Sequence, residues 1–170
     1  MTINTGVGGA LRTGYRYAIR EDYEYVIQVD GDGQHDPSYI PDLLDAATEH
    51  DMVIGSRYLN ESYERYPWIR RLGIRFFTSL INRLGGIEIT DVTSGYRVYR
   101  GAVLEQIIHR TDTHWAIEQT LDAAKQNLRI KEVSVEMPVR ETGQSHLTPD
   151  LLFVYPLRMA DTILRVMVFR

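Results

Sequence analysis

Short apolar runs alternate with longer amphipathic stretches along the chain, and this alternation constrains the fold more than any other feature. "YEYVIQVD" (23–30) and "DMVIGSR" (51–57) have the length of strands, while 7–20 and 36–50 have the periodicity of helices. Helices and strands at this spacing favour βαβ units, a parallel sheet and right-handed crossovers. The sequence therefore predicts an α/β fold.

The remaining segments continue this pattern to the end of the chain. We expect, in chain order, a loop at 58–66, a helix at 67–84, a loop and strand at 91–100, helices at 101–110 and 114–127, a strand at 128–140, a loop at 142–150 and a helix at 150–169. The sequence contains no internal repeat and no linker that would divide it. We therefore predict a single domain over residues 1–170.

Composition excludes several classes of function. The net charge is −4 and the pI is about 5.7, which argues against a general nucleic-acid-binding protein. The absence of cysteine excludes disulfides, thiolate metal sites and cysteine nucleophiles. The first residues lack the pattern of a secretion signal, and no apolar run approaches the ~18 residues of a membrane span. These features predict a cytoplasmic protein.

The stretch "QVDGDGQHDP" (28–37) places acidic side chains at the end of a predicted strand, where ligands collect in parallel α/β sheets. Asp30 and Asp32 are two residues apart and therefore point the same way. Two neighbouring carboxylates repel each other unless a cation lies between them. Together with the amide of Gln34 they suit Mg²⁺ or Mn²⁺. We interpret Asp36, followed by Pro37, as the N-cap of the next helix.

Two other motif readings fit less well. An EF-hand loop counted from Asp30 would need Gly and Glu where this chain has His35 and Pro41. "GVGGALRTG" (6–14) is similar to a dinucleotide-binding fingerprint, but no strand precedes it. An oxidoreductase that binds NAD(P) without metal therefore ranks below the metal-dependent readings. Four histidines, His35, His50, His109 and His114, do not have metal-ligand spacing, and we interpret them as structural or surface residues.

Five blocks in a fixed order resemble the family 2 glycosyltransferases, and within them the dolichyl-phosphate mannose synthase-like group. They are "NTGVGGALRTGYRYA", "VDGDGQHDP", "DMVIGSR", "DVTSGYR" and "RETGQSHL". The resemblance implies a GT-A fold, a three-layer sandwich with a mostly parallel sheet. It also implies a nucleotide-sugar donor held through a divalent cation, and transfer with inversion at the anomeric carbon.

The resemblance also assigns roles to individual residues. Asp30 and Asp32 form the D-x-D motif, with Gln34 as a third metal ligand, and catalytic roles fall on Asp32, Asp91 and Arg57. Asp91 is the general-base candidate if the acceptor is a hydroxyl. The nucleotide-sugar site is assigned to Gly6, Gly8, Arg12 and Asp30. The site for the acceptor and its phosphate is assigned to Arg57, Arg70, Arg140, Ser145 and His146, with Arg71 as an alternative to Arg70.

Members of the family normally begin with further βα units that hold the base and ribose of the donor. We expect this chain to be N-terminally truncated relative to them, with a sheet edge that a second copy or a partner chain covers. The main prediction is sugar transfer to a polyprenyl phosphate or a similar acceptor. The alternative is a non-catalytic fragment that serves as an interaction or structural module.

The helices expected at 67–84 and 150–169 combine apolar residues with arginines. Such helices fit peripheral contact with the cytoplasmic face of a membrane. They fit equally well a position against the sheet, with arginines extending from the rim. The sequence leaves both readings open.

Overall fold

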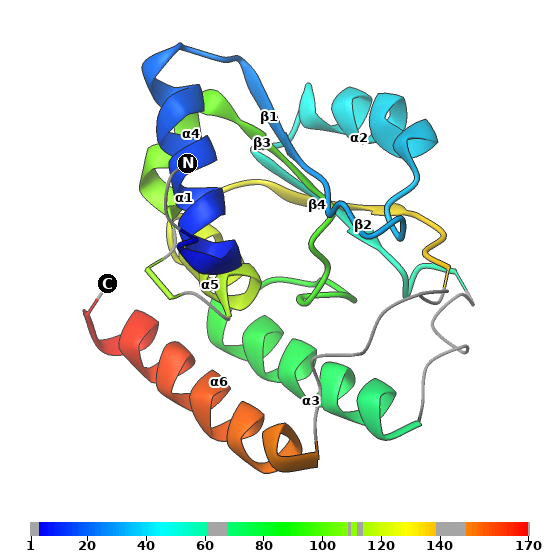
Figure 1. Ribbon diagram of the computed structural model, residues 1–170, viewed down its shortest axis with the longest axis vertical. Helices are drawn as coiled ribbons and strands as arrows, with labels where there is room; N and C mark the ends of the chain where they lie inside the picture. The colour runs from blue at the N-terminus through cyan, green and yellow to red at the C-terminus, as the bar shows by residue number, and fades with distance from the viewer. Residues whose placement is uncertain (1–3, 61–67, 109, 112–113, 139–148, 170) are drawn as a thin grey trace.

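A computed structural model describes residues 4–60, 68–108, 110–111, 114–138 and 149–169. For Arg70, for residues 149–157 and for Phe169 it describes only the backbone. Strands and helices alternate as the sequence predicts, and they assemble around one sheet (Figure 1).

The sheet has four strands in the order β1-β3-β2-β4. They are β1 (Tyr25–Gln28), β2 (Met52–Ser56), β3 (Arg97–Arg100) and β4 (Ile130–Ser134). β2 and β4 pair in parallel, whereas β3 pairs antiparallel with both β1 and β2. Three of the four strands therefore run in the same direction.

The sheet is mostly parallel, as expected, but β3 departs from the wholly parallel sheet that the spacing of helices and strands favours. The side chain of Ser56, at the end of β2, is hydrogen-bonded to Thr90 in the segment that leads into β3, with 2.7 Å between the hydroxyl oxygens. The chain is thus already at the carboxyl edge of the sheet when β3 begins. β3 must therefore run away from that edge, antiparallel to β2. The connection through the long helix after β2 is therefore not the crossover of a βαβ unit.

The helices form in chain order with boundaries close to those predicted. They are α1 (Gly6–Arg20), η1 (Pro37–Tyr39), α2 (Ile40–Ala47), α3 (Trp68–Gly85), α4 (Gly101–Leu104), η3 (Glu105–Ile107), α5 (Trp115–Lys125) and α6 (Pro149–Phe169). The single helix predicted at 101–110 is instead a short α-helix followed by a 3₁₀ turn. Asp36 is the N-cap of η1, as predicted: its carboxylate accepts from the Ser38 N–H at 2.9 Å.

The two sides of the sheet pack against different helices, because side chains alternate between the two sides along each strand. Met52 and Ile54 of β2 pack with α1, α3, α5 and α6, whereas Val53, between them, packs with α2. Figure 1 shows α2 on one side of the sheet and α1 and α5 on the other. The expected three-layer α/β arrangement of the GT-A type is thus present.

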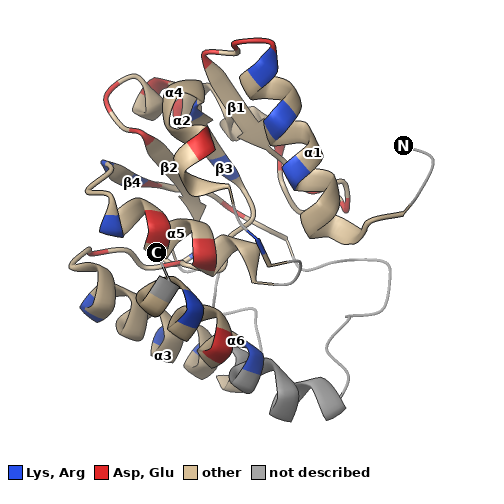
Figure 2. Ribbon diagram, turned by 90° about the vertical axis from the view of Figure 1, so that its left-hand side faces the viewer, with Lys and Arg blue, Asp and Glu red and all other residues tan. Residues whose placement is uncertain are grey.

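α3 and α6 lie side by side beyond α5 in both views of the ribbon (Figures 1 and 2). Both helices bury one face, α3 through Ile74, Phe77 and Ile81. Within the described ranges, no helix combines the length and apolar character needed to cross a bilayer. β1 and β4 are the outer strands of the sheet; the expected partner at a sheet edge stays a prediction, as does the single-domain assignment.

Candidate active site

Four segments meet at the carboxyl edge of the sheet. The acidic loop, residues 30–36, follows β1; Arg57 follows β2; and residues 135–138 follow β4. Residues 89–96 lead into β3, whose antiparallel direction places its start at this same edge. Side chains far apart in the sequence therefore come together here.

The acidic loop folds back on itself through local hydrogen bonds. One oxygen of Asp32, Oδ1, accepts from the Gln34 N–H at 3.1 Å. Gly33 has φ +79°, a conformation that glycine adopts at no steric cost. At the start of the loop, the Asp30 N–H donates to Nδ1 of His35 at 2.9 Å. The two predicted ligand carboxylates are thus carried on a compact turn.

The acidic loop also contacts its neighbours at this edge. Nε2 of Gln34 donates to the Pro138 carbonyl at 2.9 Å, which joins the loop to the segment after β4. A Cβ at Gly95 would lie 3.0 Å from Oδ2 of Asp30 and 3.4 Å from the Trp115 ring. The glycine therefore allows the Asp30 carboxylate to approach the loop before β3.

Arg57 and Asp91 form a buried ion pair at the centre of this edge. Nε and Nη2 of Arg57 donate to the two carboxylate oxygens at 2.6 and 2.8 Å, and Nη2 also donates to the Thr93 hydroxyl at 2.8 Å. Burial alone would raise the pKa of Asp91. The charge and hydrogen bonds of Arg57 outweigh that effect, so the pKa lies below its ordinary value.

These contacts bear on the role predicted for Asp91. Both of its oxygens accept hydrogen bonds from Arg57, and Oδ1 also accepts from the backbone and hydroxyl of Thr93. A carboxylate with a lowered pKa and engaged oxygens is poorly suited to take a proton from an acceptor hydroxyl. The geometry favours Asp91 as the anchor of Arg57 rather than as a general base.

Glu132 of β4, which the sequence analysis did not single out, supports the same pair. Its carboxylate accepts from the backbone N–H of Thr90 at 2.7 Å and from that of Asp91 at 2.8 Å. Burial raises the pKa of Glu132, although these hydrogen bonds lower it in part. One signal was available: Glu132 occupies the same side of its strand as the apolar Ile130, where alternation favours a buried residue.

Arg97, also absent from the sequence predictions, fixes the loop before β3 from inside. Its fully buried guanidinium donates to the carbonyls of Ser94, Ala116 and Val92 at 2.7, 3.0 and 2.9 Å. It also lies 5.7 Å from the centre of the Trp115 ring. The shape of the loop thus depends on Arg97.

Of the residues predicted to contact the donor, Gly6, Gly8 and Arg12 lie on α1, whereas Asp30 lies in the acidic loop. Gly6 and Gly8 are in the first turn of α1, and the N–H of Gly6, at φ +71°, donates to Oδ1 of Asn4 at 3.0 Å. Figure 2 shows basic segments spaced along this helix. They are Arg12, Arg16 and Arg20, four residues apart.

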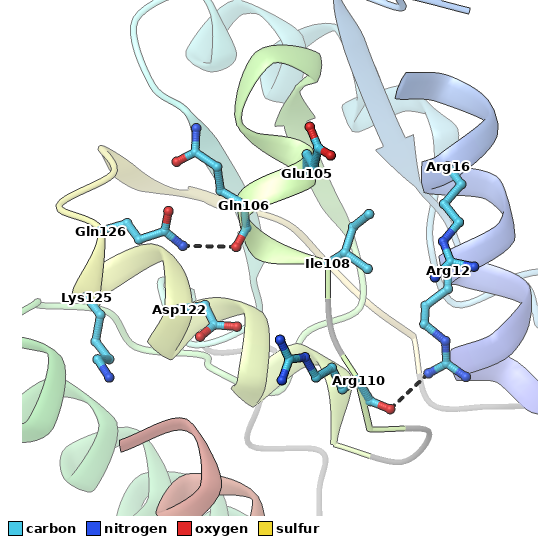
Figure 3. Close-up of a pocket in the computed structure, with 9 residues that line it drawn as sticks. All are labelled: Arg12, Arg16, Glu105, Gln106, Ile108, Arg110, Asp122, Lys125 and Gln126. Carbon is cyan, nitrogen blue, oxygen red and sulfur yellow. Dashed lines mark hydrogen bonds between the residues drawn. The ribbon is translucent and has the colours of Figure 1, made fainter. Parts of the chain in front are cut away.

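Arg12 faces a polar cavity of about 620 Å³ between α1, η3 and α5 (Figure 3). Its Nη1 donates to the carbonyls of Arg110 and Thr111 at 3.2 and 3.4 Å. The lining of this cavity includes none of the acidic-loop residues. The role of Arg12 in donor binding stays a prediction.

Other predicted residues cannot be placed. Arg140, Ser145 and His146 lie outside the described residues, as does the side chain of Arg70, whose backbone belongs to α3. Nδ1 of His50 is hydrogen-bonded to the Ala46 carbonyl at 2.8 Å, His114 is buried, and His109 lies outside the described residues.

The donor set of the acidic loop fits a hard divalent cation. Asp30 and Asp32 offer carboxylate oxygens on one short turn, and the Asp30 side chain is 46% exposed. Within the described residues, no three histidine, cysteine or acidic side chains gather as a complete metal cage. Mg²⁺ commonly keeps part of its coordination for water and substrate phosphates.

Comparison with known proteins adds independent findings. The profile of the family described as "Glycosyl transferase family 2" matches residues 1–108. The chain is 33% identical over 153 residues to an undecaprenyl-phosphate mannosyltransferase of Micrococcus luteus, and 34% identical over 154 residues to a polyprenol monophosphomannose synthase of Mycolicibacterium smegmatis. It is 32% identical over 142 residues to a UDP-N-acetylglucosamine–dolichyl-phosphate N-acetylglucosaminyltransferase of Methanococcus voltae.

These alignments include most of this chain but only part of each relative. They span 86%, 86% and 78% of this chain, in the same order. They span 63%, 58% and 55% of the three relatives. The chain therefore corresponds to somewhat more than half of the length of these proteins.

Proposed function

This chain belongs to glycosyl transferase family 2, and from that premise we propose that it serves the transfer of a sugar from a nucleotide diphosphate donor to a polyprenyl phosphate. One observation carries the proposal: the acidic loop and the Arg57–Asp91 pair meet at one edge of the sheet. The relatives support it, because two of their names contain undecaprenyl phosphate and dolichyl phosphate, and the third relative is named as a polyprenol monophosphomannose synthase.

In this proposal Asp30, Asp32 and the amide oxygen of Gln34 hold Mg²⁺ or Mn²⁺. The bound cation would neutralise the negative charge that develops on the leaving diphosphate. The protein itself holds in place the oxygens that bind the cation. The hydrogen bonds from the Gln34 N–H to the Asp32 carboxylate and from Nε2 of Gln34 to the Pro138 carbonyl do so by fixing the turn.

A phosphate acceptor fits the site better than a hydroxyl. A polyprenyl phosphate is already ionised near neutral pH and needs no general base. Asp91, held by Arg57, is poorly placed to act as one. Arg57 would then orient the acceptor phosphate through its positive charge, because its Nε and Nη2 already donate to Asp91.

A lipid-linked acceptor also gives a reason for the exposed apolar residues of α3. Trp68, Leu72 and Phe76 are 66%, 60% and 62% exposed and recur every four residues, so they share one side of the helix. Arg71 and Arg75 stand beside them in the sequence. We propose that this side of α3 contacts the headgroup region of a membrane peripherally.

The proposed metal site can be tested by titrating the protein with Mn²⁺ and a nucleoside diphosphate, with binding followed by calorimetry. We expect the diphosphate to bind in a metal-dependent way, and Asp32→Asn to abolish that dependence. Asp36→Asn is the matched control, because it removes a charge from the same loop while asparagine still caps the helix. Metal-independent binding, or an unchanged Asp32→Asn, would overturn the site.

A second candidate function is a non-catalytic module. It stays a candidate because the chain spans only 63% and 58% of the length of two relatives. An assay of sugar transfer to a short-chain polyprenyl phosphate separates the two. Turnover by this chain alone supports the enzyme. Metal-dependent diphosphate binding without turnover supports the module.

A further inference from the structure

His35 lies against both the backbone and the side chain of Asp30. It lies in the acidic loop and is only 7% exposed. Its Nδ1 accepts from the Asp30 N–H at 2.9 Å, so the ring proton of the neutral imidazole is on Nε2. Nε2 lies 3.9 Å from Oδ2 of the same aspartate. One ring thus faces both the backbone and the carboxylate of Asp30.

The ring of His35 is itself held in place. It stacks on Tyr96, with ring centres 4.8 Å apart and planes 14° from parallel. Tyr96 is fully buried, and its hydroxyl donates to the Asp36 carbonyl at 2.9 Å. The acidic loop is therefore fastened to the start of β3 at two points, through the His35 ring and through the Asp36 carbonyl.

The other side of Asp30 is confined as well. A Cβ at Gly95 would lie only 3.0 Å from Oδ2 of Asp30, so the carboxylate packs closely against the loop before β3. The aspartate is thus held between the His35 ring and this loop. Such contacts restrict the direction of a ligand carboxylate, and residues with this role commonly tune metal affinity.

We propose that His35 is a positioning residue, which fixes the Asp30 carboxylate toward the cation of the diphosphate site. This inference rests on the proposed function for the identity of the cation. The contact between His35 and Asp30 does not depend on the proposed function, and it can be measured without metal. A residue that only stabilised the fold would affect stability and leave metal affinity unchanged.

The experiment compares variants that separate the ring from the hydrogen-bond acceptor. His35→Phe keeps an aromatic ring on Tyr96 but cannot accept from Asp30. His35→Asn loses the ring but places an oxygen near the position of Nδ1, whereas His35→Gln places it further along, near that of Nε2. Tyr96→Phe is the control, because it loses the bond to Asp36 without touching Asp30.

We expect His35→Phe to weaken Mn²⁺ binding in the presence of a nucleoside diphosphate by about 10- to 100-fold. The thermal midpoint should stay close to that of the unaltered protein, and the Asp30 amide should exchange with solvent faster. His35→Asn and Tyr96→Phe should retain most of the affinity for Mn²⁺, whereas His35→Gln should lose it. If His35→Phe does not fold, the inference is tested by the difference in Mn²⁺ affinity between His35→Asn and His35→Gln.

Equal Mn²⁺ affinity in His35→Phe and the unaltered protein would overturn the inference. If the unaltered protein binds no Mn²⁺, the metal part of the proposed function fails instead. The inference is then decided by exchange at the Asp30 amide, which must become faster in His35→Phe and remain slow in Tyr96→Phe. Unchanged exchange in His35→Phe would overturn it in that case.

Discussion

The guanidinium of Arg57 and the carboxylate of Asp91 meet in two hydrogen bonds inside the protein, at 2.6 and 2.8 Å, although they stand 34 residues apart in the sequence. The pair joins the end of β2 to the segment before β3. Its burial makes each partner depend on the other, because a buried charge that loses its partner is strongly destabilising.

Asp91→Asn should therefore lower the free energy of unfolding by about 3–5 kcal/mol, since it leaves the Arg57 charge buried without a carboxylate. Urea denaturation measures this change. The double variant Arg57→Met/Asp91→Leu is the control and should recover much of the loss, because neither charge remains. A single variant as stable as the unaltered protein would contradict the role of the pair.

The same pair predicts a dependence on pH. The pKa of Asp91 is lower in the folded protein than in the unfolded chain, where it is about 3.9. The stability that its ionisation contributes is therefore fully present above about pH 4 and is lost as the pH falls through the folded value. The stability difference between the unaltered protein and Asp91→Asn should shrink in that acidic range. A difference that stays constant or grows on acidification would contradict the prediction.

Gly95→Ala should act on the candidate metal site with little effect on the fold. The new methyl group would lie 3.0 Å from Oδ2 of Asp30, whose half-exposed side chain can move away. Metal-dependent diphosphate binding should weaken, as calorimetry can show.

Gly14→Ala is the matched control for that substitution. A Cβ at Gly14 meets nothing within 4 Å and lies inside α1. Gly14→Ala should stabilise the protein by about 1 kcal/mol and leave metal-dependent diphosphate binding unchanged. Equal binding by both glycine variants would argue that Asp30 is not a ligand.

The exposed side of α3 predicts membrane binding that depends on its apolar residues. Trp68→Ser/Phe76→Ser should reduce co-sedimentation with vesicles that contain anionic phospholipid, because both side chains are more than half exposed and available to the bilayer surface. Tyr23→Ser, which removes an exposed aromatic before β1, is the control. Equal sedimentation of the α3 variant and the unaltered protein would contradict the proposal.

The sequence by itself determined the features that depend on near neighbours. Strand and helix positions follow from hydrophobic periodicity, and the Asp36 cap and the turn from Asp32 to Gln34 involve residues only two positions apart. These features form through contacts along a short segment, so the residue pattern is enough to predict them. The predicted α/β class and the predicted edge for the site follow in the same way.

Only the tertiary structure decided which distant residues meet at that edge. The antiparallel β3 between β1 and β2 places Asp91 beside Arg57 and brings Tyr96 under His35. It also leaves β4 next to β2, where Glu132 reaches the backbone of Thr90, 42 residues away in the sequence. Such contacts depend on strand order and direction, which are set by the packing of the whole sheet and its helices rather than by the residue pattern of any one strand.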